Sequence, residues 1–215
     1  MNREFWNGKT VLITGHTGFK GSWLTLWLKK IGAEVIGFSK DIPTKPSLFE
    51  LADISKNINS IEGDIRNYDE VQNTIAKTKP EIIFHLAAQS LVRSSYTNPR
   101  ETYETNIMGT VNLLDAVRSS KKTCAIINVT SDKCYDNKEF NKSHTEEDRL
   151  GGYDPYSSSK GCSELITSAF RNSYFEGTNN EITLASARAG NVIGGGDWAK
   201  DRLIPDIIEA ITQNK

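Results

Sequence analysis

Short apolar runs alternate with longer stretches of helical periodicity along this chain of 215 residues. The first run, residues 10–14, is apolar and β-branched, which is typical of a buried strand. Apolar side chains then recur at helical spacing over residues 22–31, and Gly32 ends the pattern. The same reasoning predicts strands at residues 34–38, 58–61, 82–86, 125–130 and 182–187, and helices at about 67–78, 99–117, 156–170 and 204–211. The alternation predicts an α/β fold, a doubly wound parallel sheet with helices on both faces.

Local signals set some of these boundaries. Asn67, with an acid three residues on, is typical of a helix N-cap, and Pro99 suits a first helical turn. The helix after Pro99 is expected to place one apolar face on the core: Tyr103, Ile107, Val111, Leu114 and Val117. The polar stretch 136–152 is the best loop candidate, and its length suggests function or flexibility.

A glycine-rich loop, Gly15-His16-Thr17-Gly18-Phe19-Lys20-Gly21, joins the first strand to the first helix. Gly15 permits a tight turn, Gly18 lets backbone amides approach a pyrophosphate, and Gly21 allows close packing of helix on strand. The spacing GxxGxxG in this strand–loop–helix context predicts a dinucleotide site in a Rossmann-like fold. The alternative is an ordinary glycine-rich turn, with Lys20 a solvated lysine of the first helical turn.

An acid near the end of the second strand would accept a hydrogen bond from the adenosine ribose. Asp41 follows Gly21 by twenty residues, close to the expected offset, although it lies beyond the expected strand end. NAD is therefore the favoured cofactor. Ser39 and Lys40 leave NADP open.

Tyr156 and Lys160 stand four residues apart, on one face of a predicted helix. A nearby cation favours phenolate and lowers the tyrosine pKa toward the range where it can take a proton from a substrate hydroxyl. Ser131, at the end of the preceding strand, would hydrogen-bond the substrate oxygen beside Tyr156. The order of nucleotide loop, strand-end hydroxyl and YxxxK favours a catalytic site over two unrelated surface residues.

Asp132 and Lys133 place an acid and a base next to that hydroxyl. Such a pair can run an elimination, with Lys133 removing a proton alpha to a new ketone and Asp132 protonating a leaving hydroxyl. This role requires the pKa of Lys133 to be depressed by Lys160 or by burial. The alternative is a surface ion pair at the start of a loop.

Five blocks together resemble the nucleotide-sugar 4,6-dehydratases of the extended short-chain dehydrogenase/reductase superfamily, within the NAD-dependent epimerase/dehydratase family. They are GHTGFKG (15–21), HLAAQ (85–89), TSDKCY (130–135), GYDPY (152–156) and RAGNVIGGGDW (188–198). Lys133 stands where the related dTDP-sugar enzymes have glutamate. With His16 and Lys20, it makes the chain resemble the CDP-glucose branch.

The resemblance implies oxidation at the sugar C4, loss of water across C5 and C6, and return of hydride to C6, with NAD as the recycled cofactor. It implies that Asp64 and Ile65 contact the adenine and that Leu86, Ala87, Ala88 and Thr105 also contact the cofactor. Substrate contacts are implied for Gln89, Ser90, Asn106, Ser131, Arg188 and Asn191, although Asn106 could instead only bridge helices. A homodimer is implied through the helices around 103–117 and 156–170.

Composition narrows the function classes. The formal charge is −1, without a run of like charges, which argues against nucleic-acid binding. No apolar run approaches a membrane span or a signal peptide, so no membrane association is expected. Cys124, Cys134 and Cys162 lack the spacing of a disulfide framework or a zinc site. These features predict a cytoplasmic protein without a metal site.

The expected domains are residues 1–187, which carry the cofactor and catalytic side chains, and 188–215, the start of a substrate-binding region. Relative to the resembled family the chain ends early, so most of the substrate domain is expected to be absent. Two other functions stay open, an NAD-dependent sugar-nucleotide epimerase and a non-catalytic NAD-binding fragment.

Overall fold

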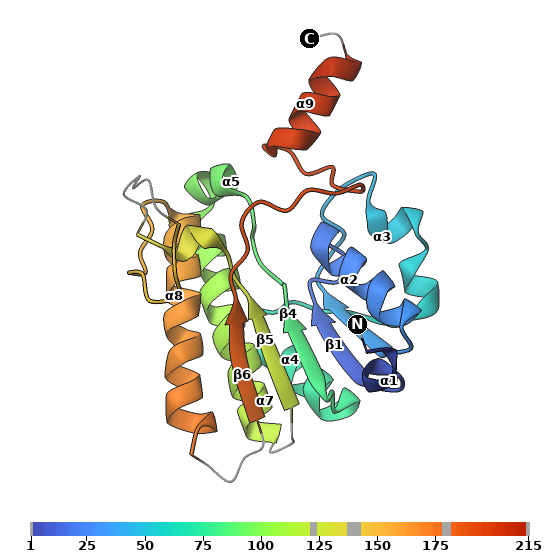
Figure 1. Ribbon diagram of the computed structural model, residues 1–215, viewed down its shortest axis with the longest axis vertical. Helices are drawn as coiled ribbons and strands as arrows, with labels where there is room; N and C mark the ends of the chain where they lie inside the picture. Colours follow the sequence, from blue (N-terminus) through green and yellow to red (C-terminus); the bar gives the residue numbers. More distant parts are fainter. Residues whose placement is uncertain (1, 121–123, 137–142, 178–181, 214–215) are drawn as a thin grey trace.

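The computed structural model describes residues 2–120, 124–136, 143–177 and 182–213. Six strands form one parallel sheet: β1 Thr10–Thr14, β2 Glu34–Ser39, β3 Asn59–Glu62, β4 Ile82–His85, β5 Cys124–Val129 and β6 Ile182–Ala187. Their order is β3-β2-β1-β4-β5-β6, so the strand order reverses between β1 and β4 (Figure 1). In open α/β sheets ligands bind at the carboxyl ends of the strands beside this reversal. The predicted fold class is confirmed.

Helices and turns connect the strands. The α-helices are α1 Arg3–Trp6, α2 Phe19–Lys30, α3 Leu48–Leu51, α4 Tyr68–Thr78, α5 Val92–Thr97, α6 Pro99–Tyr103, α7 Gly109–Ser120, α8 Pro155–Phe170 and α9 Leu203–Thr212. Shorter 3-10 turns are η1 Ile54–Asn57 and η3 Asp132–Cys134, and π turns are η2 Glu104–Met108 and η4 Arg171–Phe175. The predicted cap Asn67 accepts from the amides of Asp69 and Glu70 at the start of α4.

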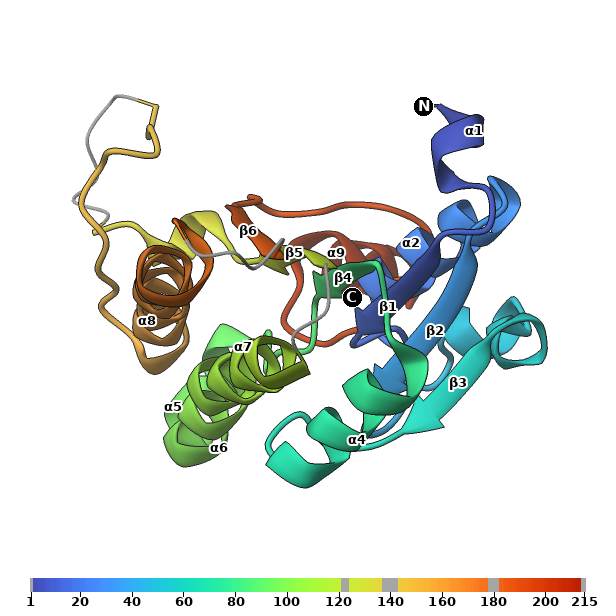
Figure 2. The same cartoon turned by 90° about the horizontal axis from the view of Figure 1, so that it is seen from below.

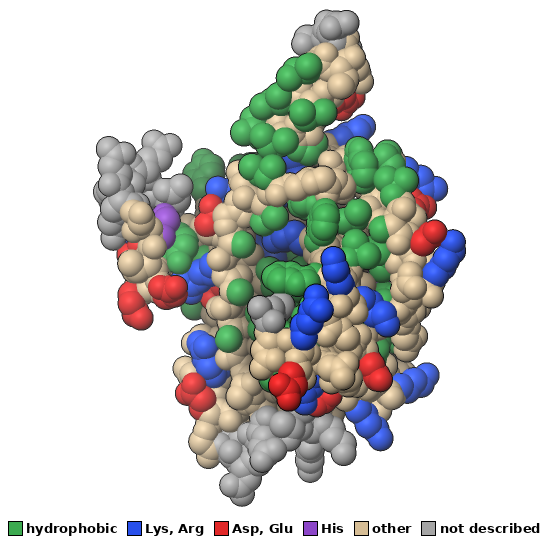
Figure 3. All heavy atoms as spheres, turned by 45° about the vertical axis from the view of Figure 1, so that its right-hand side comes forward, with side chains coloured by type: hydrophobic (Ala, Val, Ile, Leu, Met, Phe, Trp, Pro, Cys, Tyr) green, Lys and Arg blue, Asp and Glu red, His purple; other side chains and the backbone are tan. Residues whose placement is uncertain are grey.

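Successive side chains along the strands point to opposite faces of the sheet and pack into two hydrophobic layers. One layer joins Leu12, Ile83 and Ile126 to side chains of α4 and α7, and the other joins Val11 and Ile13 to Leu28 of α2. Figure 2 shows α4, α7 and α8 on one face of the sheet and α2 on the other. Helix α9 projects away from the sheet, and its apolar side chains Leu203, Ile207, Ile208 and Ile211 are exposed (Figures 1 and 3).

Two predicted helices differ from the structure. Helix α2 begins at Phe19 rather than residue 22, because Gly18 is its N-cap and the glycine loop is shorter than expected. The predicted helix after Pro99 contains the π turn η2, whose extra residue rotates the segment before it relative to α7. Leu114 and Val117 are buried as expected, but Tyr103 is 38% exposed. Residues 137–142 of the predicted loop lie outside the described residues.

Candidate functional site

The glycine loop at the end of β1 is a tight backbone turn. Gly15 has φ +76°, and a Cβ there would lie 2.8 Å from the backbone nitrogen of Ala87. A Cβ on Gly21 would lie 2.1 Å from the carbonyl oxygen of Gly15. Neither glycine can therefore be replaced without moving backbone. Gly18 is different, since its Cβ would meet only the Gly15 carbonyl at 3.4 Å, so the space beside it is open for a ligand.

A cavity of about 770 Å³ lies against this loop and brings together most of the predicted cofactor residues. Its lining includes Gly15, Thr17, Gly18, Phe19, Lys20, Gly21, Asp41, Asp64, Ile65, Leu86, Ala87, Ala88, Gln89, Ser90 and Thr105. The α2 N-terminus faces it, and the N-cap Gly18 offers no side chain to the first-turn amides. Those amides are suited to a phosphate, because the helix dipole favours negative charge there. The residues present thus fit a dinucleotide.

His16 is the loop residue whose side chain does not line that cavity. Its ring is 1% exposed, with Nδ1 2.8 Å from Ser39 Oγ and Nε2 2.8 Å from Ser60 Oγ. Burial lowers its pKa to about 4, although a backbone hydrogen bond at Phe38 acts in the opposite direction. The predicted cofactor role of the His16 side chain is therefore corrected to a structural one. The glycine at position 37 of the second strand could have indicated a buried neighbour, because a Cβ there would lie 2.2 Å from the His16 ring.

Two acidic residues, Asp41 and Asp64, line the same cavity. Asp64 pairs with Arg66 at 2.6 Å, and the hydrogen bond from Arg66 lowers the pKa of Asp64. Asp41 lines the cavity, and its carbonyl accepts from Thr17 Oγ1 at 2.6 Å, which ties the second strand's end to the glycine loop. Both predicted acids thus line the cavity that lies against the glycine loop.

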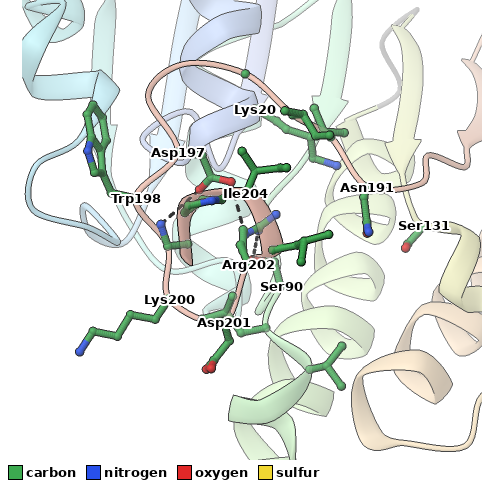
Figure 4. Close-up of a pocket in the computed structure, with 18 of the residues that line it drawn as sticks. Lys20, Ser90, Ser131, Asn191, Asp197, Trp198, Lys200, Asp201, Arg202 and Ile204 are labelled. Atoms are coloured by element: carbon green, nitrogen blue, oxygen red, sulfur yellow. Dashed lines mark hydrogen bonds and ion pairs between the residues drawn. The ribbon is translucent and has the colours of Figure 1, made fainter. Parts of the chain in front are cut away.

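A second cavity of about 850 Å³ adjoins the first, and the two share Lys20, Leu86, Ala88 and Ser90 in their linings. The residues that also line it are Ser131, Lys133, Tyr156, Lys160 and Asn191. Figure 4 shows Ser131 and Asn191 at this cavity. The strand end and α8 therefore bring the predicted serine, tyrosine and lysine to one surface.

Burial controls the charges of the tyrosine and lysine. Tyr156 is 9% exposed, and burial raises its pKa despite a hydrogen bond to Ser131 and the charge of Arg202. The prediction of a lowered pKa for Tyr156 is therefore wrong. Lys160 Nζ lies 6.0 Å from the tyrosine ring centroid. Its own pKa is lowered to about 8, first by burial and then by the charge of Lys20.

The Asp132 and Lys133 side chains meet at 3.5 Å and are 42% and 45% exposed. Ser131 Oγ donates to Asp132 Oδ1 at 3.0 Å and accepts from the amide of Lys133 at 3.2 Å, so the three residues form one local turn. The Lys133 side chain is thus half-exposed and not buried. Lys160 is the lysine that is buried near another cation.

Two predicted substrate residues point elsewhere. Arg188 pairs with Glu164 at 3.0 Å rather than lining either cavity, because residues 186 and 188 face α8 while Ala189 faces the cavity. Asn106 is buried, donates to Gln89 O and Ser159 Oγ, and accepts from Gln89 N. The interpretation of Asn106 as a bridge between segments matches this geometry. Sequence reasoning missed Glu164, which carried no motif signal.

Arg202 is a second residue of the site that sequence reasoning missed. It lines both cavities, its Nε lies 3.6 Å from Asp197 Oδ2, and its Nη2 donates to Ser90 Oγ at 3.3 Å (Figure 4). Within the described ranges, no group of three or more His, Cys, Asp or Glu side chains is arranged to hold a metal ion. None of the described helices combines the length and apolar character that a membrane crossing requires.

The strand order, the glycine loop and the cavities at the carboxyl edge define a Rossmann-like fold. A family model for GDP-mannose 4,6 dehydratase matches residues 12–215, and the chain belongs to that family. A CDP-glucose 4,6-dehydratase from Salmonella typhimurium is 57% identical over 218 residues, covering 100% of this chain and 61% of the relative. A CDP-paratose 2-epimerase from Salmonella typhi is 35% identical, covering 72% of this chain and 50% of the relative.

Solved structures agree with this fold. The dTDP-glucose 4,6-dehydratase from Bacillus anthracis, in complex with NAD, has a TM-score of 0.79 and 25% identity, covering 97% of this chain and 63% of that one. A dTDP-glucose 4,6-dehydratase from Streptomyces venezuelae has a TM-score of 0.82 and 24% identity, covering 95% and 62%. The chain thus spans less than two thirds of the length of these proteins.

Proposed function

We propose that the protein carrying this chain is an NAD-dependent CDP-glucose 4,6-dehydratase. The observation that carries the proposal is the joining of two cavities, one against the glycine loop and one lined by Ser131, Tyr156 and Lys160. The 57% identity to a CDP-glucose 4,6-dehydratase supports the substrate, since the match runs over this whole chain. NAD-bound dehydratase structures of the same fold support the cofactor.

The cavity against the glycine loop would hold the dinucleotide. All of the residues proposed to hold it line this cavity. Gly15, Gly18 and Gly21 would shape the pyrophosphate turn, Asp41 would bind the ribose and Asp64 the adenine, and Thr105 would also contact the cofactor. When bound, NAD would supply hydride acceptance from the sugar C4 and hydride return to C6. The adjoining cavity would place the hexose beside it.

The chain's own side chains would move the protons. Tyr156 would take the proton of the sugar 4-hydroxyl, with Ser131 hydrogen-bonded to the same oxygen and the charge of Lys160, one helical turn away, opposing the effect of burial on the phenol. Lys133 removes the C5 proton, and Asp132 gives a proton to the C6 hydroxyl, which leaves as water. Lys133 would then return its proton to C5 as the hydride is returned to C6, and the proton that Tyr156 accepted would replace the one that Asp132 gave to the leaving water. Residues 1–187 would carry this chemistry, and 188–215 would begin the substrate-binding part.

Incubation of the protein from its complete reading frame with CDP-glucose and NAD tests the proposal. Mass spectrometry should show a nucleotide sugar that has lost one water, with no net formation of NADH. An unchanged substrate mass would contradict the proposal, and calorimetry with NAD alone would then show whether only a dinucleotide-binding role survives.

An NAD-dependent sugar-nucleotide epimerase is the second candidate. The 35% identity to a CDP-paratose 2-epimerase favours it, whereas the adjacent Asp132–Lys133 pair counts against it. Lys133→Met distinguishes the two. A dehydratase should lose water elimination and accumulate the 4-keto sugar, which borodeuteride would trap with one deuterium. Unaffected turnover in the variant would favour epimerisation.

We also infer a cytoplasmic homodimer. Tyr96, Tyr103, Met108 and Leu165 expose apolar surface on the helical layer of α5 to α8, which fits a helix-to-helix interface. The three cysteines are free, which fits a reducing compartment. Sedimentation velocity should show a dimer that Leu165→Glu dissociates, and a monomeric wild type would contradict this inference.

A further inference from the structure

Glu164 is a nearly fully buried carboxylate on α8 that the proposed chemistry leaves without a role. Its side chain is 4% exposed and accepts hydrogen bonds from three donors. Oε1 accepts from Thr130 Oγ1, and Oε2 accepts from Ser186 Oγ at 2.8 Å and from Arg188 Nη2 at 3.0 Å. These donors belong to the ends of β5 and β6, so Glu164 ties both strand ends to α8.

The tied strand ends carry the proposed site. Thr130 directly precedes Ser131. Arg188 Nη1 donates to the Tyr135 hydroxyl at 3.0 Å, so the same ion pair also fixes the far side of the turn that carries Asp132 and Lys133. On α8, positions 156, 160 and 164 follow at four-residue intervals and therefore lie along one face.

A buried ion pair is weak evidence for stability, because taking both charges out of water costs about as much as their attraction returns. Replacement of a buried ion pair by apolar side chains of similar volume is often neutral for stability. Stability alone therefore does not account for the Glu164–Arg188 pair, and we looked to the adjacent Ser131, Tyr156 and Lys160 for its role.

We propose that Glu164 and Arg188 are positioning residues that hold Ser131 against Tyr156, and that Glu164 is the anion facing Lys160. This inference rests on the proposed function for the roles of Ser131, Tyr156 and Lys160. Arg188 acts from behind the site and does not contact the sugar.

Electrostatics support the second half of this inference. The groups acting on Lys160 are Lys20 from α2, Cys134 from η3 and Glu164 from α8, with His85 of β4 and the Tyr156 ring also facing it. Burial raises the pKa of Cys134 to about 11 and lowers that of His85 to about 3, so both are neutral near pH 7. Burial acts to raise the pKa of Glu164, but hydrogen bonds from Arg188, Thr130 and Ser186 outweigh it and keep the carboxylate ionised.

The first test is the charge of Lys160, measured without turnover. An NMR titration of ¹³C-labelled lysines in the full-length protein, with the Lys160 signal assigned by its loss in Lys160→Arg, reports the lysine pKa. Glu164→Gln should lower it by about one unit, since an opposite charge nearby favours the charged form. Glu164→Asp keeps the charge and should leave it nearly unchanged. An unmoved Lys160 titration in Glu164→Gln would overturn the electrostatic role.

The second test is turnover with CDP-glucose. Glu164→Gln should reduce kcat at least about tenfold at nearly constant KM for the sugar, and should move the pH–rate profile toward lower pH. Removing an anion makes every proton of the Tyr156–Lys160 pair easier to lose, whereas simple structural damage lowers the profile without displacing it. The matched control is Glu81→Gln, which removes a 2.6 Å ion pair with Lys9 outside the site and should move neither quantity.

Arg188→Gln distinguishes positioning from substrate contact. A positioning role lowers kcat and leaves KM unchanged, whereas a contact raises KM, and a tenfold rise in KM at constant kcat would overturn the inference. If the single variant unfolds, Glu164→Gln/Arg188→Gln should recover part of the lost thermal stability, because it leaves no unpaired buried charge. If the losses of stability in the two single variants simply add in the double variant, the coupling between Glu164 and Arg188 is contradicted. A wild type that forms no product contradicts the proposed function alone, since the titration and the cycle still decide this inference.

Discussion

On the β1–β2 side of the strand reversal, a glycine backbone turn shapes the site, whereas on the β5–β6 side the site consists of side chains beside hydrogen bonds and an ion pair that join α8 to the strand ends. Gly15 and Gly21 act through the absence of a Cβ, and the turn needs only their local spacing. Ser131, Tyr156 and Lys160 depend on Glu164 and Arg188, which come from α8 and the end of β6. Backbone turns are set by short sequences, while side-chain networks are set by packing across the fold.

Tyr156→Phe tests the side-chain half and should have the largest effect. The buried ring stays, so the fold should be retained, but the loss of the proton acceptor should reduce turnover about 10²–10⁴-fold. Product formation by mass spectrometry measures this, and calorimetry should show that NAD still binds. Tyr153→Phe, at a fully exposed position just before α8, is the matched control. Activity near wild type in Tyr156→Phe would remove the phenol from the proposed site.

Gly21→Ala tests the backbone half. Its Cβ would lie 2.1 Å from the Gly15 carbonyl oxygen, so the loop must shift, and NAD affinity should fall about a hundredfold or more. That fold-change corresponds to about 3 kcal/mol. Gly177→Ala is the control, because it has φ +67° with nothing within 4 Å and should cost only about 1 kcal/mol of backbone strain. Equal NAD affinity in wild type and Gly21→Ala would show that this close packing does not shape the cofactor turn.

His16 is the exception on the backbone side, because its buried ring ties the loop to β2 and β3. Its pKa of about 4 lies below the ordinary 6.5, so folding favours the neutral ring. The stability that comes from keeping this ring neutral is fully present above pH 6.5 and falls as the pH falls toward 4. At pH 4 the loss of unfolding free energy amounts to about 3 kcal/mol. Denaturant unfolding at a series of pH values should show a smaller loss in His16→Gln than in wild type. His85, the other buried histidine, is present in both proteins. Identical pH slopes would contradict the burial of a neutral His16.

Asn67→Ala should have the smallest effect, because the cap is a local feature of α4. It removes a side-chain oxygen that accepts from two first-turn amides, which should cost about 1 kcal/mol of unfolding free energy. Chemical denaturation measures the change, and Asn67→Asp should restore most of it through its own carboxylate. A loss of several kcal/mol would mean that the cap also supports the sheet.

Sequence reasoning succeeded where the signal lay within a few residues. The strand pattern predicted all six strands in the right places, and Asn67 predicted the start of α4, because periodicity and caps act locally. The helix after Pro99 was only partly right. No local sequence pattern indicates the π turn at Glu104–Met108. Helical spacing therefore predicted Tyr103 on the core face, although its side chain is partly exposed.

The same division applies to the site. The sequence by itself determined the glycine turn, the Tyr156–Lys160 spacing and the position of Ser131 at a strand end, since each follows from chain direction and helical geometry. Only the tertiary structure decided that Arg188 faces Glu164, that His16 is buried under β2, and that Lys160 rather than Lys133 is the desolvated lysine. Orientation at a strand end and burial of a charge depend on elements far apart in the chain, and no spacing of residues encodes them.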